Sequence, residues 1–165
     1  MAWVLNEPAK RTEKDLLQWA NDQIVHGVPR QIICNYLLDW GSRSLSFKEK
    51  EAAFKAESHL FGVMVDRNLN GKTLEAAGEI DKAIVLYEEN VSDLFAGDHP
   101  YDRLRVIYTK RKQFAEAIRV CGTFVKIADM LVEEGSRRDD LKPKRDKFMS
   151  LIEKLDKNYL GAQND

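Results

Sequence analysis

Apolar residues recur at intervals of three and four positions along most of this chain, which is the spacing of helices that bury one side. A first helix is expected from Thr12, which can cap it, to Gly27, where a left-handed residue is easily accommodated. A second helix is expected to begin at Pro29 and to end at Gly41. Sustained alternation with a period of two is absent, so the pattern predicts an all-α protein.

The longest apolar stripe follows Ser46 and Glu49, whose spacing forms a capping box. Two asparagines and Gly71 are poor helix formers that could interrupt this helix. The repeat register described below instead places Gly71 inside a helix, where a small residue lets two helices approach closely. We therefore favour one long helix over residues 47 to 77, with or without a kink.

Further helical patterns fill the rest of the chain. They predict helices over Ile80–Phe95, Tyr101–Arg111 and Phe114–Glu134, and a last helix from Leu141 to about Tyr159. One side of the last helix is apolar, and the opposite side is rich in lysine and glutamate. This suits a cap on a helical stack, because terminal repeats need a polar outer face.

An internal repeat with a period of 34 residues lies in the second half of the chain. Residues 78–84 align without a gap on residues 112–118, and both segments end in an Ala-Ile pair. The same offset superposes further apolar residues, Leu74 on Tyr108, Leu86 on Val120 and Val91 on Val125. A fixed period of this length is typical of stacked helical hairpins.

These residues resemble the tetratricopeptide repeat, a helix–turn–helix unit. The matching positions are Gly71, Leu74, Gly78, Ile80, Ala83, Ile84 and Tyr87 in the first copy, and Leu104, Tyr108, Phe114, Ala117 and Ile118 in the second. Residues 98–123 also resemble a variant found in small bacterial repeat proteins of unassigned role. The sequence departs from the family at Arg105 and Lys112, where small residues are usual, and at Asn90 and Phe124, where alanine is usual.

The resemblance implies an α-α superhelix of about seven helices that forms one structural domain. Residues 1–63 would be a helical extension packed on the repeats, residues 64–131 two repeats, and residues 132–165 a capping helix and tail.

Composition is ordinary for a globular protein, with 165 residues, 44% hydrophobic and 32% charged. The net charge of −1 provides no general attraction to nucleic acid or to an anionic membrane. No apolar stretch is long enough to span a membrane, and the N-terminal sequence lacks the features of a secretion signal. The only cysteines, Cys34 and Cys121, are expected to be buried thiols. Their scarcity and the lack of signal features favour a cytoplasmic location.

Candidate chemistry is sparse. Asp98, His99 and Asp102 could contribute metal ligands, but no further histidine or cysteine lies at ligand spacing. We instead expect Asp98 to cap the helix that Pro100 opens. No nucleophile–histidine grouping and no phosphate-binding loop is visible. We therefore expect no catalytic residue, no metal and no cofactor.

Charge differs between the two copies. Residues 64–97 contain seven acidic and three basic residues, whereas residues 98–131 contain four acidic and seven basic ones. A basic patch is expected from Arg103, Arg105, Arg111 and Lys112. This patch is either part of ordinary solvated helix faces or a surface that attracts an acidic or phosphorylated partner.

In tetratricopeptide proteins the first helix of each repeat lines a concave groove. The resemblance thus implies groove residues Asn68, Lys72, Glu75, Asp102, Val106, Thr109 and Lys110. The expected function is a non-catalytic interaction module, a scaffold or adaptor that binds a peptide or helix of a protein partner, with an acidic partner favoured.

The alternative is a nucleic-acid-binding or regulatory protein that uses the basic second copy and the C-terminal helix. It is disfavoured because the helix from Pro29 to Trp40 contains only one basic residue, Arg30. No membrane partner is expected. A homo-oligomer, formed through the aromatic arm Trp3-Val4-Leu5 or an open end of the helical stack, is left open.

Overall fold

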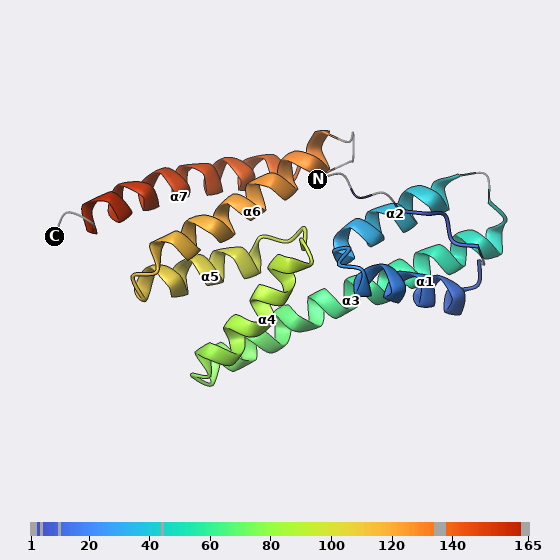
Figure 1. Cartoon of the computed structure of the whole chain (residues 1–165), viewed down its shortest axis with the longest axis horizontal. Coiled ribbons are helices and arrows are strands. Elements are labelled where there is room, and N and C mark those ends of the chain that lie inside the picture. Colours follow the sequence, from blue (N-terminus) through green and yellow to red (C-terminus); the bar gives the residue numbers. More distant parts are fainter. Residues whose placement is uncertain (1–2, 4, 10, 44, 134–137, 163–165) are drawn as a thin grey trace. The chain divides into compact units, whose positions relative to one another are not determined.

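The computed structural model describes residues 3, 5–9, 11–43, 45–133 and 138–162. Within these ranges the chain forms seven α-helices and no β-strand (Figure 1), which confirms the predicted all-α class. The helices are α1 (Glu13–Val25), α2 (Arg30–Ser42), α3 (Phe47–Ala76), α4 (Ile80–Ser92), α5 (His99–Lys110), α6 (Phe114–Glu133) and α7 (Leu141–Ala162). The expected helix end at Glu134, and Val4 of the aromatic arm, lie outside the described residues. The superhelical arrangement stays a prediction.

Two compact units make up the chain, Met1–Arg67 and Asn68–Asp165. Helix α3 begins in the first unit and ends in the second, and it is continuous over 30 residues, as favoured from the sequence. The predicted division into extension, repeats and cap is not tested by these units. Among the described residues, no helix is long and apolar enough to cross a membrane.

Helix starts follow the local sequence signals. The side chain of Thr12 accepts a hydrogen bond from the amide of Asp15 at 3.3 Å and so caps α1. At the start of α3, the amide of Ser46 donates to the carboxylate of Glu49 at 2.7 Å, and the amide of Glu49 donates back to the Ser46 hydroxyl at 3.4 Å. The predicted capping box is therefore confirmed. Gly27 ends α1 with a positive φ of 83°.

Several predicted helix bounds differ from the structure by one to three residues, and two of these differences are informative. Helix α2 does not stop at Gly41 but continues to Ser42. A Cβ on Gly41 would lie 3.3 Å from the Cβ of Ala53, so this glycine permits a close approach of α2 and α3 rather than a turn. Helix α4 ends at Ser92 instead of Phe95, because the chain turns at Leu94, which has a φ of 56°.

The first unit buries Trp40 completely, together with apolar residues of α1, α2 and α3. Trp40 is therefore a core residue, whereas Trp19 is half-buried and its ring lies 5.3 Å from that of Tyr36. Trp3 is exposed and Leu5 is half-buried. Cys34 in this unit and Cys121 in the second are buried free thiols, as predicted.

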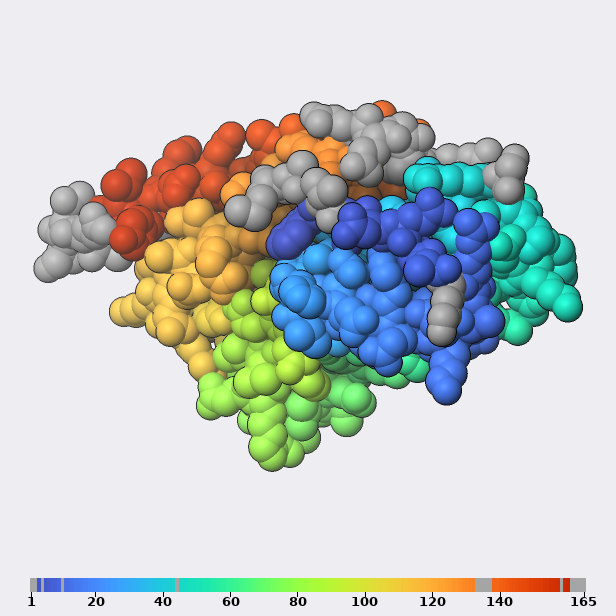
Figure 2. Space-filling model, turned by 45° about the vertical axis from the view of Figure 1, so that its right-hand side comes forward, coloured from blue at the N-terminus to red at the C-terminus, as the bar shows by residue number. Residues whose placement is uncertain are grey.

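The second unit is a row of helices in which each helix packs on the next, α4 on α5, α5 on α6 and α6 on α7. Helices α6 and α7 lie side by side in both views (Figures 1 and 2). The ring of Phe124 lies 5.2 Å from that of Tyr101 and 4.5 Å from that of Phe148. An aromatic side chain at this position thus fills the core between α5 and α7, where the tetratricopeptide pattern has alanine.

Helices α3 and α4 meet at Gly71 and Tyr87. A Cβ added to Gly71 would lie only 2.5 Å from Cε1 of Tyr87, so the ring occupies the space that a side chain would need. Tyr87 itself is completely buried. The predicted role of Gly71 as a point of close helix approach is therefore confirmed.

We predict that Gly71→Ala destabilises the protein by about 1–3 kcal/mol, because the ring of Tyr87 must move out of its packed position. Gly62 is the matched control, since it lies in the same helix and a Cβ there would meet nothing within 4 Å. Gly62→Ala should stabilise by about 0.5–1 kcal/mol through helix propensity. Urea unfolding of both variants measures the difference, and an equal effect of the two would contradict this packing.

Candidate functional site

Within the second unit, an ion pair joins the last turn of α3 to α5. The carboxylate of Glu75 accepts hydrogen bonds from both Nε and Nη2 of Arg103, at 2.9 and 2.6 Å. The hydroxyl of Tyr87 donates to the same carboxylate at 2.9 Å. These bonds lower the pKa of Glu75, with the Arg103 hydrogen bond the largest cause. The pKa of Tyr87 is raised, first by burial and then by its bond to Glu75.

Further ion pairs join α5 to α7. Lys144 contacts Asp98 at 3.0 Å, and Lys147 contacts Asp102 at 3.8 Å. Asp102 also accepts two hydrogen bonds from Arg105 in its own helix, at 3.1 and 2.9 Å. Helices α3, α5 and α7 are therefore connected by charged side chains. We call these paired side chains, together with Tyr87, His99, Lys72 and Lys110, the inner face.

The prediction that Asp98 caps α5 is correct for the position of the residue and wrong for its side chain. Asp98 occupies the position before α5, but its side chain makes no capping hydrogen bond. Its backbone is helical (φ −76°, ψ −18°) rather than extended, so the carboxylate is not placed over the first amides of the helix. The carboxylate instead binds Lys144.

The predicted groove residues fall into two groups. Five have contacts within the unit or are partly buried: Asn68, Glu75, Asp102, Val106 and Thr109. Lys72 and Lys110 are exposed and have no ion-pair partner among the described residues. Lys110 lies two turns after Arg103 on α5, so the two side chains share a side of that helix.

The predicted basic patch is largely neutralised by neighbouring carboxylates. Arg103 binds Glu75, Arg105 binds Asp102, and Arg111 binds Asp81 at 2.8 Å. The fourth member, Lys112, is exposed in the turn after α5. Its φ of 58° places its backbone in the left-handed region, and its amide donates to the carbonyl of Thr109. Arg103 and Arg111 thus join α5 to other helices and Arg105 pairs within α5, so these arginines do not form a free cationic surface.

Sequence reasoning missed four members of the inner face, Tyr87, His99, Lys144 and Lys147. A signal for the lysines did exist, because Asp98, directly before α5, and Asp102 are four residues apart and match two lysines three residues apart on α7. It could not be read without knowing that these helices are neighbours.

His99 is the least satisfied group of this face. Its Nε2 is buried and has no hydrogen-bond partner within the described part of the chain. The imidazole ring packs edge-on against Tyr87, with centroids 5.7 Å apart. Burial lowers the pKa of His99, and the charges of Arg103 and Lys72 lower it further, while Glu75 and Asp98 oppose the shift.

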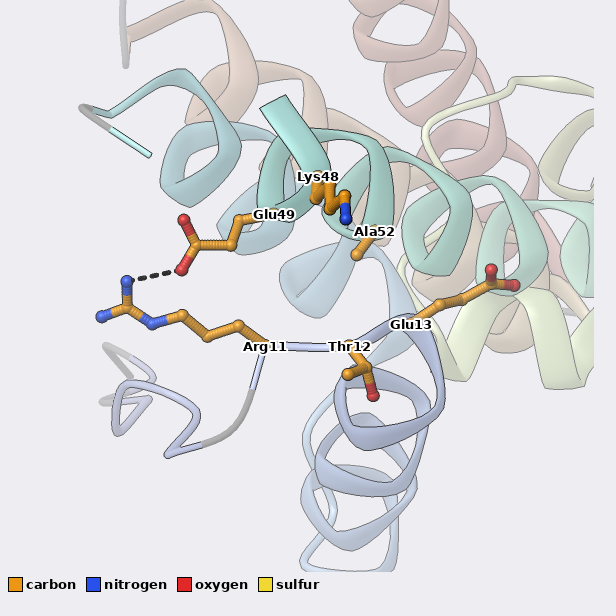
Figure 3. A pocket seen from close by; sticks show the side chains of 6 residues that line it. All are labelled: Arg11, Thr12, Glu13, Lys48, Glu49 and Ala52. Carbon is orange, nitrogen blue, oxygen red and sulfur yellow. Dashed lines mark hydrogen bonds and ion pairs between the residues drawn. The ribbon is translucent and has the colours of Figure 1, made fainter. Parts of the chain in front are cut away.

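The first unit contains a separate hollow of about 420 Å³ between the start of α1 and the start of α3 (Figure 3). It is lined by Arg11, Thr12, Glu13, Lys48, Glu49 and Ala52. Arg11 and Glu49 bind each other across one end of it at 2.9 Å. Two of its four charged residues, Arg11 and Glu49, are therefore paired with each other, and we regard the inner face as the stronger candidate.

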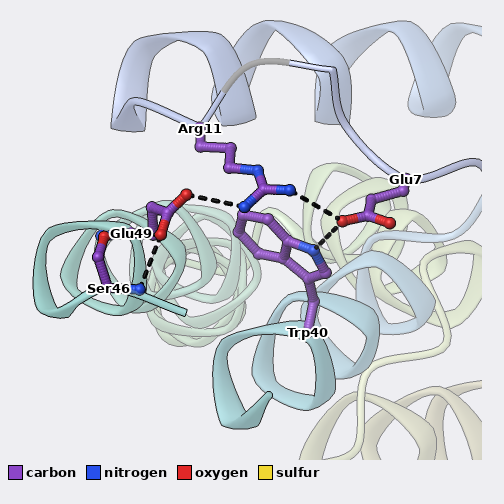
Figure 4. Close-up of polar contacts among 5 residues, drawn as sticks. All are labelled: Glu7, Arg11, Trp40, Ser46 and Glu49. Atoms are coloured by element: carbon purple, nitrogen blue, oxygen red, sulfur yellow. Dashed lines mark hydrogen bonds and ion pairs between the residues drawn. The ribbon is translucent and has the colours of Figure 1, made fainter. Parts of the chain in front are cut away.

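The N-terminal segment is fixed beside this hollow by bonds to Trp40 (Figure 4). The indole Nε1 of Trp40 donates to Glu7 at 3.0 Å, and the guanidinium of Arg11 lies 5.7 Å from the indole ring. Arg11 also contacts both Glu7 and Glu49. Hydrogen bonds from the Ser46 side chain, from Arg11 and from the Ser46 backbone, in that order, lower the pKa of Glu49 to about 2.

No group of three histidine, cysteine or acidic side chains suited to a metal ion occurs in the described ranges. The chain matches none of the protein-family models, curated proteins or solved structures with which it was compared. The resemblance to tetratricopeptide repeats therefore rests on the residues quoted above.

We predict that the variant His99→Phe loses less stability in acid than the parent chain does. The pKa of His99 is lower in the folded state than its ordinary 6.5, so the unfolded chain binds the proton first and stability falls as the pH drops below that value. The phenyl ring keeps the ring contact, removes the unpaired Nε2 and should add about 1 kcal/mol at neutral pH. Thermal unfolding from neutral pH to about pH 5 tests this. His59→Phe is the control, because it makes the same substitution at an exposed site and removes no buried nitrogen.

We also predict that Glu7→Ala lowers stability by about 1 kcal/mol, because the buried indole N–H of Trp40 loses its acceptor. Asn6→Ala is the matched control, since the hydrogen bond between Asn6 and Trp19 uses the backbone carbonyl oxygen of Asn6, which the substitution keeps. Glu7→Gln retains an acceptor and should restore most of the loss. Chemical unfolding followed by tryptophan fluorescence measures all three, and equal destabilisation by Glu7→Ala and Asn6→Ala would count against this bond.

Proposed function

We propose that this chain is a non-catalytic protein-interaction module of the tetratricopeptide type, which binds a peptide or helix of a partner protein along the inner face. The observation that carries the proposal is the linkage of three helices by ion pairs beside two lysines that have no ion-pair partner in the described ranges. The 34-residue repeat supports the same function, because stacked helical hairpins serve as binding surfaces. The proposed location is the cytoplasm.

The ion pairs favour a surface that is organised before the partner arrives. Arg103 and Glu75 form a two-point contact that restricts both side chains, and Glu75 is further held by Tyr87. A surface whose side chains are already ordered loses less conformational entropy on binding. The exposed Lys72 and Lys110 then provide positive charge, which supports an acidic partner.

The same pairs weigh against nucleic-acid binding. A nucleic acid would need free cations along its phosphates, but three arginines of the basic patch are already bound to carboxylates. Phosphate contact would therefore have to displace Glu75, Asp102 and Asp81. The alternative predicts binding to unrelated DNA or RNA at low salt that weakens steeply as salt is added.

The test is affinity capture with the intact chain, followed by calorimetry of each captured partner. We predict that the double variant Lys72→Glu, Lys110→Glu binds at least about tenfold more weakly, because it places two negative charges on the inner face. Lys126→Glu, Lys157→Glu is the control with the same change in net charge. Those lysines are exposed on α6 and α7 and take no part in the ion pairs of the inner face. Unchanged binding by the first variant would refute the proposed surface.

A further inference from the structure

Helix α3 has apolar residues on two opposite sides in the first unit. One side is buried and contains Ala52, Ala53, Ala56 and Leu60. The other side contains Phe47 and Phe54, whose side chains are 82% and 63% exposed. A helix on the surface of a globular protein normally buries one apolar side and presents polar residues on the other. Two exposed phenylalanines on a single line are therefore a feature that packing within the chain does not explain.

The two phenylalanines are seven residues apart, so they differ by only about 20° around the helix axis. Lys50 and Glu51 lie between them along the axis. At about 100° per residue, Lys50 falls on one flank of the phenylalanine line and Glu51 on the other. Both are exposed, and Lys50 has no ion-pair partner among the described residues. The surface is thus an apolar line with opposite charges on its two flanks.

We propose that this surface binds a second copy of the chain, with the two α3 helices parallel and related by a two-fold axis. In that arrangement Phe47 meets Phe47 of the second copy, and Phe54 meets Phe54. The two-fold rotation places the Lys50 flank of one helix on the same side of the interface as the Glu51 flank of the other. Lys50 of each copy therefore lies beside Glu51 of the other, and two equivalent ion pairs form.

The flanking charges select this orientation over the alternative. In an antiparallel pair the same flank of both helices lies on the same side, so Lys50 would face Lys50 and Glu51 would face Glu51. Like charges in such positions disfavour the arrangement. In the parallel pair, Glu51 keeps its contact with Lys55, 2.9 Å away in its own helix, and gains a second cation.

The proposed contact is small. It depends on two aromatic side chains and one ion pair from each copy, which places it among weak, reversible interfaces rather than obligate ones. We therefore expect a dimer that dissociates on dilution. The inference does not depend on the proposed function, because it uses another part of the chain and another partner.

Sedimentation velocity of the full chain over a wide range of concentrations tests the dimer. Phe47→Ser, Phe54→Ser should remain monomeric where the parent chain dimerises, with an unchanged circular dichroism spectrum. Val25→Ser is the control, since Val25 is an equally exposed apolar residue at 83% but lies at the end of α1. Val25→Ser should dimerise like the parent. The proposal would be overturned if the parent chain is monomeric at every concentration, or if the phenylalanine variant and Val25→Ser lose the dimer equally.

Two further kinds of variant test the orientation. Phe47→Cys should form a disulfide-linked dimer under mild oxidation only if the helices are parallel, and the native cysteines are buried. Lys50→Glu and Glu51→Lys should each weaken the dimer about fivefold, because symmetry changes both ion pairs at once. The double variant Lys50→Glu, Glu51→Lys should restore the affinity of the dimer. A Phe47→Cys variant that dimerises without crosslinking, or a dimer that is indifferent to both single charge changes, would contradict the parallel arrangement.

Discussion

The contact of Tyr87 with Gly71 is the constraint on which the second unit depends. Because position 71 has no side chain, the ring lies against the backbone of α3. From there its hydroxyl reaches Glu75, and its ring packs against His99 at the start of α5. The carboxylate that Tyr87 holds is the one that binds Arg103, so a single aromatic residue relates three successive helices. The pair of Glu75 with Arg103 in the inner face is therefore held in part by this packing.

Local sequence signals predicted the helices well because their physical causes are local. The cap at Thr12 and the capping box at Ser46 each involve residues three positions apart, so spacing alone reveals them. Two departures from the local signals involve partners elsewhere in the chain. Gly41 lies inside α2 at a point where Ala53 of α3 is close to it, and the carboxylate of Asp98 binds Lys144, 46 positions away. Spacing within one segment contains no information about such partners.

The candidate site was predictable only in part for the same reason. The 34-residue repeat indicated which helix faces to inspect, and Glu75 and Asp102 do lie among the bonded residues of the inner face. Whether Arg103 and Arg111 are free or paired could not be predicted, because their partners come from other helices, whereas the pair of Arg105 with Asp102 lies within α5 at a spacing of three residues. Arg103, Arg105 and Arg111 read as a basic patch in the sequence, but carboxylates neutralise them in the structure. The charge that remains available belongs to lysines, which are less suited than arginine to bidentate pairing.

This distribution of charge bears on how the two proposed surfaces would act together. The arginines are held in structural pairs, and only Lys72 and Lys110 of the inner face lack such a pair within the described ranges, so each copy offers a modest attraction to an acidic partner. A modest attraction becomes substantial when two sites are joined, because the second binding event is then intramolecular. A weak dimer through Phe47 and Phe54 would provide that joining without any change to the inner face. Since the dimer dissociates on dilution, the gain in affinity would itself depend on protein concentration.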